Sequence, residues 1–255
     1  MRNRILKAAA ILACGIAIVF GQAKQPQPKS QKELDALKLV FGTQDPDARI
    51  KAAKDLITNF ADTDFKELAF QMIAMSYQQK NDLENMIVYA EKTLEVAPKS
   101  YQAMLMISTA LAQRTREFDL DKEEKLARAE KLAKQAMEII PTTPKPRPDI
   151  TDAQWDGAKK DALSEAHQGL AMAASVRKKY DVAITEYKQS IDGAATPDAS
   201  TMVRLGSTYN LAGKPDDAIA VLDKVLAMPN LHAQIKVAAE GEKKNSEKLK
   251  AAGKK

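Results

Sequence analysis

The sequence predicts an all-α protein, an α-solenoid in which about five helix–turn–helix repeats follow one another along the chain. Three observations predict this class. Only 5% of the 255 residues are aromatic and ten are glycine, while 45% are hydrophobic, a composition typical of packed helices. Apolar residues recur at the i, i+3, i+4, i+7 spacing of one helix face. The segments 81–100 and 213–230 can be laid over each other without a gap, so the helical pattern repeats.

Residues 1–23 have the pattern of a secretory signal peptide. Three basic residues within the first seven precede thirteen uncharged residues from Ala8 to Phe20, and a small residue, Ala23, closes the segment. This pattern predicts cleavage after Ala23 and export, with a periplasmic or cell-envelope location. The alternative of an uncleaved membrane anchor is less favoured, because a spanning helix needs about 20 apolar residues.

Cys14 offers a third interpretation of the same segment. The sequence Ile-Leu-Ala-Cys that ends at Cys14 resembles a bacterial lipobox, in which the cysteine is lipidated and becomes the mature N-terminus. The residues after Cys14 are still apolar, whereas a lipoprotein usually continues into a polar tether. We therefore favour ordinary cleavage and expect membrane contact only if the chain is uncleaved or lipidated at Cys14. Cleavage after Ala23 leaves no cysteine and hence no disulfide.

The net charge of +5 does not belong to the predicted folded region. The signal segment contributes three positive charges, and residues 240–255 hold six lysines against three glutamates. Residues 24–239 are left with about one net negative charge. A nucleic-acid reader carries its basic excess on the folded domain, so we expect no nucleic-acid partner.

The best-defined repeats lie at residues 67–100 and 199–232, and both resemble the tetratricopeptide repeat, a 34-residue helix–turn–helix unit. The family pattern places a large residue, Leu-Gly, Tyr, Ala, an aromatic residue, Ala and Pro at fixed positions. In residues 67–100 these positions hold Phe70, Ile73, Ala74, Tyr77, Met86, Ala90, Thr93 and Pro98. In residues 199–232 they hold Met202, Leu205, Gly206, Tyr209, Ala218, Leu222 and Val225, with Pro229 three positions early. The resemblance implies a right-handed solenoid in which small residues admit the neighbouring helix.

Weaker copies complete the predicted array. Residues 33–66 match with Leu39, Ala52 and Leu56, residues 101–143 match but are nine residues too long, and residues 164–197 match best in their second half. The excess near residues 114–125 is expected to form extended helix ends or a charged surface loop. The predicted organisation is therefore a disordered segment 24–32, repeats one to three at 33–143, a Pro-rich connection and helix extension at 144–163, repeats four and five at 164–232, and a capping helix with a Lys-rich tail at 233–255.

Three local signals fix helix starts within this plan. Asp45 and Pro46 are expected as N-cap and first residue of one helix, and Asn81 with Asp82 as the turn and cap of another. Thr151 and Gln154 form a capping-box pair at the start of a helix that is expected to run from residue 152 to about residue 178. The Pro-rich segment before it is expected to be extended, or alternatively to link two separate half-arrays.

The sequence contains no pattern that predicts catalysis, a cofactor or a metal. His167 and His232 have no second ligand at metal-binding spacing, and His167 falls at a packing position of the fourth repeat. Glycine-rich phosphate loops and nucleophile motifs are absent from the 255 residues. We therefore predict no enzyme and no cofactor.

The resemblance instead implies a partner-binding groove lined by the first helix of each repeat. By family register the groove positions are Gln71, Met75, Gln78, Gln102, Leu105, Thr109, Gln168, Met172, Val203, Ser207 and Asn210, with Gln79, Gln113 and Ser175 beside them. This set is uncharged and lacks the carboxylate-binding clamp of the family's best-known peptide readers. Amides and methionines suit main-chain hydrogen bonds and adaptable apolar contacts. An open alternative is a groove that binds nothing, or one filled by the chain's own Pro-rich or terminal segment.

The sequence thus predicts a non-enzymatic scaffold of the cell envelope that binds a protein or peptide in a neutral-polar concave groove. The alternative is a lipid-anchored or membrane-tethered accessory subunit of an envelope assembly, secretion or polysaccharide system.

Overall fold

The computed structural model describes residues 26–253, and within this range the chain forms eleven α-helices, one short 3-10 helix and no strand. The helices are α1 Gln31–Gly42, α2 Pro46–Asn59, α3 Lys66–Gln79, α4 Leu83–Val96, α5 Tyr101–Arg114, α6 Lys122–Ile139, η1 Ile140–Thr142, α7 Asp152–Val176, α8 Tyr180–Gly193, α9 Ala199–Leu211, α10 Pro215–Leu226 and α11 Ala233–Ala252. The predicted all-α class is confirmed.

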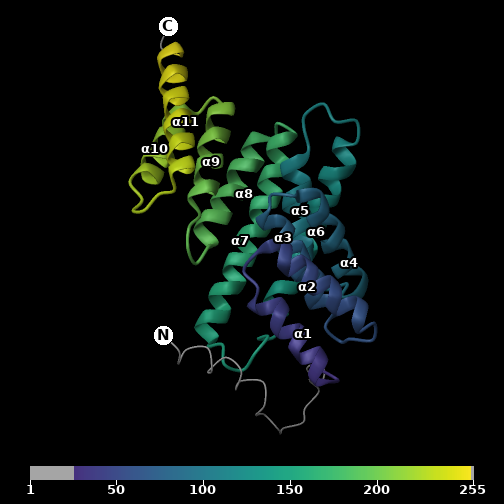
Figure 1. Ribbon diagram of the computed structural model, residues 1–255. Coiled ribbons are helices and arrows are strands. Elements are labelled where there is room, and N and C mark those ends of the chain that lie inside the picture. Colours follow the sequence, from purple (N-terminus) through teal and green to yellow (C-terminus); the bar gives the residue numbers. More distant parts are fainter. Residues whose placement is uncertain (1–25, 254–255) are drawn as a thin grey trace.

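The helices pack as five consecutive pairs, followed by α11 (Figure 1). Within each pair the first helix packs against the second, as α3 does against α4 and α7 against α8. Each second helix also contacts the first helix of the next pair, which joins the pairs into one continuous array. This is the α-solenoid that the repeat predicts.

The first helices form the inner layer of the solenoid. The helices α5 and α7 contact each other directly, and so do α9 and α11. In residues 26–253, no second helix makes a comparably close contact with the next second helix. A layer whose helices lie closer together is on the inside of a curved array, so the solvent-facing side of the first helices is the concave side.

The predicted helix starts are confirmed atom by atom. The Asp45 carboxylate accepts the backbone N–H of Ala48 at 2.8 Å, and Pro46 is the first residue of α2. The Thr151 hydroxyl accepts the backbone N–H of Gln154 at 3.2 Å, and the Gln154 side chain accepts the backbone N–H of Thr151 at 2.9 Å. These bonds satisfy donors that a helix N-terminus would otherwise leave free.

Two glycines allow helices to approach closely. A Cβ atom on Gly206 would lie 2.8 Å from the side chain of Leu222, where α9 packs against α10. A Cβ atom on Gly169 would lie 2.8 Å from the Ser108 hydroxyl, where α7 packs against α5. The first close approach is among those predicted from the repeat, and the second sets how closely the two central first helices pack.

The N-terminal end of the array departs from its prediction in two respects. The segment 24–32 is expected to be disordered, but α1 begins at Gln31 and Ser30 caps it. The buried carboxylate of Glu33 holds this start in place, because it accepts the backbone N–H of Lys29 at 2.6 Å and the hydroxyl of Thr63 at 2.6 Å. Leu39, expected to pack, is exposed because no preceding repeat covers that side of α1.

The extra residues of the third repeat both lengthen helix α6 and form a surface loop. Helix α6 has 18 residues, and a loop from Thr115 to Asp121 separates it from α5. The side chains of Phe118 and Leu120 project from this loop into solvent. The start of α6 is tied to the end of α7 by an ion pair between Glu123 and Arg177 at 2.7 Å.

The C-terminal residues form a helix rather than a frayed tail. Helix α11 continues to Ala252, the far end of the described range. Lys243 pairs with Asp223 of α10 at 2.7 Å, and Lys250 pairs with Asp216. The predicted capping helix therefore continues through the Lys-rich residues up to 252, because aspartates of α10 lie opposite these lysines.

Candidate functional site

The candidate surface is the solvent-facing side of α1, α3, α5, α7 and α9, which we call the first-helix wall. It lies on the concave side of the array. The eleven residues predicted to line the groove all belong to these first helices. The structure places them in three different environments.

The part of the wall on α3 is open to solvent. Met75 is 46% exposed, Gln78 is exposed and Gln71 is half-buried. Gln102, at the start of α5, is exposed as well. An exposed methionine beside amide side chains gives this region both apolar contact and hydrogen-bonding capacity.

The central part of the wall is closed by packing between α5 and α7. Leu105 is 2% exposed and packs with Leu170 in the core, while Met172 is 6% exposed and packs with Leu205. Leu105 and Met172 are therefore core residues, contrary to their predicted place on the groove surface. The physical reason for Leu105 is the close approach of α7 to α5 at Gly169. Thr109 stays half-buried and donates its hydroxyl to the backbone carbonyl of Leu105 at 2.8 Å.

The C-terminal part of the wall is occupied by α11. The carboxylate of Glu242 accepts the Ser207 hydroxyl at 3.1 Å and the Asn210 side-chain amide at 3.0 Å. Asn210 is buried, and Val203 is half-buried. On α7, the half-buried Gln168 donates its amide to the Thr201 hydroxyl of α9 at 2.6 Å.

Two further residues of the wall were missed by sequence reasoning. Phe41 of α1 is exposed and lies one 34-residue repeat before Met75. Glu165 of α7 is half-buried and lies three residues before Gln168, which places both on one helix face. Repeat register alone could have found both residues, had every position of each first helix been followed.

Glu165 is the electrostatically unusual residue of the wall. Burial raises the pKa of its carboxyl group above the ordinary value of 4.5. The pKa of the nearby Tyr101 hydroxyl is also raised, first by burial and then by the negative charge of Glu165. Across residues 26–253, no hydrogen bond or ion pair is made to the Glu165 carboxylate.

His167 and Glu186 form another polar contact beside the wall. The Nδ1 atom of His167 lies 2.7 Å from a carboxylate oxygen of Glu186, and both side chains are half-buried between α7 and α8. In the described part of the chain, no three His, Cys, Asp or Glu side chains are grouped to hold a metal ion.

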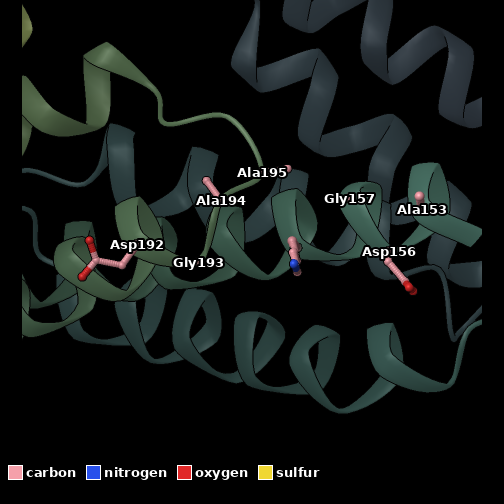
Figure 2. A pocket seen from close by; sticks show the side chains of 8 residues that line it. Ala153, Asp156, Gly157, Asp192, Gly193, Ala194 and Ala195 are labelled. Carbon is pink, nitrogen blue, oxygen red and sulfur yellow. The ribbon is translucent and has the colours of Figure 1, made fainter.

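A depression lies between the start of α7 and the end of α8 (Figure 2). Its lining is Ala153, Asp156, Gly157, Lys160, Asp192, Gly193, Ala194 and Ala195. Figure 2 shows the Asp156 and Asp192 side chains at opposite ends, pointing apart. The two carboxylates of the lining therefore do not converge within the depression (Figure 2).

Comparison with known proteins agrees with the class that the fold defines, an α-solenoid of helix pairs with a first-helix wall. Residues 69–100 match the family model described as tetratricopeptide repeat. Residues 69–100 therefore form a tetratricopeptide repeat, and the fold of the described chain is of the tetratricopeptide-repeat type; such repeats are generally scaffolds for protein–protein interaction. A search of curated proteins finds no match to the sequence.

Solved structures share the fold at low sequence identity. The thermophilic TPR protein TTC0263 of Thermus thermophilus has a TM-score of 0.58 at 15% identity, covering 82% of this chain and 98% of its own. PilW, a widely conserved type IV pilus biogenesis factor, has a TM-score of 0.59 at 15% identity, covering 88% and 92%. The MamA protein has a TM-score of 0.53 at 14% identity, covering 77% and 91%.

Within residues 26–253, no helix has both the length and the apolar character that crossing a membrane requires. The predicted signal segment 1–23 and Cys14 lie outside the residues that the structure describes.

Proposed function

We propose that this protein is a non-enzymatic scaffold of the cell envelope, which binds an extended segment of a partner protein along the open part of the first-helix wall. The observation that carries the proposal is the exposure of Met75 at a position where the later first helices are covered. Nearly half of the Met75 side chain is exposed on the concave side of the array. This exposed surface is available to a partner.

The chemistry of the open wall suits an extended chain. Gln71, Gln78 and Gln102 carry amides that can donate to and accept from a peptide backbone. Phe41 and Met75 supply apolar contacts one repeat apart.

The envelope location rests on the signal-like residues 1–23, which predict export. The fold similarity to PilW, a type IV pilus biogenesis factor, is compatible with a role in an envelope assembly. Protein fractionation tests this part directly. Recovery of the chain in the cytoplasm at full length would contradict it.

A matched pair of variants tests the binding surface. Met75→Glu changes the open wall on α3, and Val88→Glu changes a residue of similar exposure, 44% against 46%, on the second helix α4 of the same pair. Both variants and the unchanged protein, residues 24–255, are used to select from a random heptapeptide library displayed on phage. We expect peptides enriched by the unchanged protein to be retained by Val88→Glu and lost by Met75→Glu. Equal loss in both variants, or in neither, contradicts binding at the wall.

Cys14 supports a second candidate, a lipid-anchored accessory subunit of an envelope assembly, secretion or polysaccharide system. The short motif that ends at Cys14 has the residues of a lipobox. The mass of the mature N-terminal peptide separates the two candidates. A peptide that begins at Lys24 supports the exported scaffold, whereas an acylated peptide that begins at Cys14 supports the anchored subunit.

A further inference from the structure

We propose that Glu165 is the anion of the first-helix wall and that it binds one cationic group of the partner segment, a lysine ammonium or an arginine guanidinium. This inference rests on the proposed function. It adds that the bound segment carries a basic side chain.

Every other partly buried carboxylate in residues 26–253 has a partner. Those of the glutamates are Lys29 and Thr63 for Glu33, Arg128 for Glu91, Arg177 for Glu130, His167 for Glu186, and Ser207 and Asn210 for Glu242. The partners of the half-buried aspartates are Asn85 for Asp82 and Lys125 for Asp119. Glu165 is half-buried too, and no donor or cation in this range reaches it. The chain therefore satisfies its partly buried acids consistently, and Glu165 is the exception.

Apolar residues pack beside Glu165 on the core side, while Asp161 and Gln168 lie one turn away on its own face of α7. Its neighbours along α7, Ala162, Leu163 and Ala166, belong to or pack against the central hydrophobic cluster, and so does Tyr101 of α5. Burial raises the pKa of the Glu165 carboxyl group, although part of the residue remains accessible to solvent. Glu165 is therefore desolvated by burial and still partly accessible to an incoming side chain.

An ionised carboxylate in such a place destabilises the folded chain unless it is paired. A cation brought by the partner removes this penalty, and it forms charge-assisted hydrogen bonds with little competition from water. The predicted wall positions are otherwise uncharged amides, hydroxyls and apolar groups. The wall therefore selects a single basic residue in a segment that is otherwise bound by backbone and apolar contacts.

The test uses the same phage-displayed heptapeptide library, with residues 24–255 of the unchanged protein, Glu165→Gln and Glu240→Gln. Glu240 is an exposed glutamate of α11, away from the open wall, and serves as the matched control. We expect peptides selected by the unchanged protein and by Glu240→Gln to carry Lys or Arg at one fixed position. We expect Glu165→Gln to lose this preference while it still selects peptides. Circular dichroism confirms that each variant is folded.

One selected peptide is then measured by calorimetry against a version in which its basic residue is replaced by norleucine. The norleucine replacement should lower the affinity of the peptide for the unchanged protein about tenfold. Glu165→Gln should bind the norleucine peptide no more weakly than the unchanged protein binds it. Additive losses overturn the pairing. Selected peptides that require Met75 but show no basic preference overturn the inference and leave the proposed function standing. Failure to enrich any peptide overturns both.

Discussion

The two ends of the first-helix wall carry residues at equivalent repeat positions, but one end is exposed to solvent and the other is covered. Met75 of α3 and Ser207 of α9 occupy the same repeat position, but Met75 is 46% exposed whereas Ser207 donates its hydroxyl to Glu242 of α11. Asn210, one turn later on α9, is buried against the same carboxylate. The difference comes from the following first helix. Helix α11 packs directly on α9, whereas α5 makes no such close contact with α3.

This comparison shows that repeat position alone does not make a residue available for binding. The spacing between successive first helices decides which positions stay in solvent. Spacing is closest at α5–α7 and α9–α11, so the most exposed of the predicted wall positions, Met75, Gln78 and Gln102, lie in the N-terminal half of the array. A partner is therefore expected to contact α1, α3 and the start of α5 before it meets α9.

The largest expected effect comes from replacing one buried residue and, for comparison, one exposed residue of the wall. Leu105→Ala removes a side chain that is 2% exposed, and it should lower the free energy of unfolding by about 2–5 kcal/mol. Met75→Ala removes a side chain on the open wall, and it should cost less than about 1 kcal/mol. Denaturant unfolding followed by circular dichroism measures both. Similar losses in the two variants would mean that the centre and the N-terminal part of the wall are equally open.

A smaller effect is expected from the glycine that sets the α5–α7 spacing. Gly169→Ala places a Cβ atom 2.8 Å from the Ser108 hydroxyl, which donates to the buried carbonyl of Ala129 at 2.8 Å and cannot move without losing that bond. We expect a loss of about 1–3 kcal/mol, because extra volume in a packed contact is destabilising.

Gly241→Ala is the control for Gly169→Ala. Gly241 lies in α11, and its added Cβ atom meets nothing within 4 Å. There the better helix propensity of alanine should stabilise the protein by about 1 kcal/mol. A stabilised Gly169→Ala variant would show that α7 can retreat from α5 without cost.

Local features of the fold were predictable from the sequence because their causes are local. Asp45 and Thr151 cap helices through bonds to residues three positions away, and the helical periodicity around them needs no tertiary information. The small residue Gly206 was predictable from the repeat pattern, because Leu222 of the same repeat faces it.

The states of the candidate site depend on contacts that the repeat pattern does not encode. Leu105 is buried because α7 approaches α5 at Gly169, which is not a signature position of the repeat. Asn210 is buried because Glu242 lies opposite it, 32 residues away on a helix outside the repeats. Glu165 follows the register, but its lack of a partner is visible only when every neighbouring element is in place.

The closed end of the wall can be loosened with an effect of about 1 kcal/mol. Glu242→Ala removes the acceptor of the Ser207 hydroxyl, whose net hydrogen bond contributes about 1 kcal/mol, whereas the Asn210 amide keeps the backbone carbonyl of residue 242 as an acceptor. We expect faster amide hydrogen exchange in α11 and at the end of α9, with exchange in α3 unchanged. Glu240→Ala, on the solvent side of the same helix, is the control. Unchanged exchange in α11 would mean that its apolar contacts alone close this end.

The smallest expected effect has an unusual sign, because Glu165→Gln should stabilise the protein. The folded-state pKa of Glu165 is raised above its ordinary value of 4.5, so between these two pKa values the folded chain binds more protons than the unfolded chain. Glu165 is neutral in both states below the lower value and imposes no penalty there. As the pH rises through the folded pKa, the carboxylate ionises where burial desolvates it and the stability of the unchanged protein falls.

The measurement is therefore a difference between Glu165→Gln and the unchanged protein, followed by denaturant unfolding from pH 4 to pH 8. The glutamine side chain of this variant carries no ionisable group, so the variant should match the unchanged protein at pH 4 and exceed its stability increasingly as the pH rises. Glu240→Gln controls for the loss of an exposed carboxylate. A Glu165→Gln variant that is less stable at pH 8 than at pH 4, relative to the unchanged protein, would mean that the carboxylate is paired in the folded chain. In that case the first-helix wall would hold no free anion at Glu165, and the difference between its two ends would be one of packing alone.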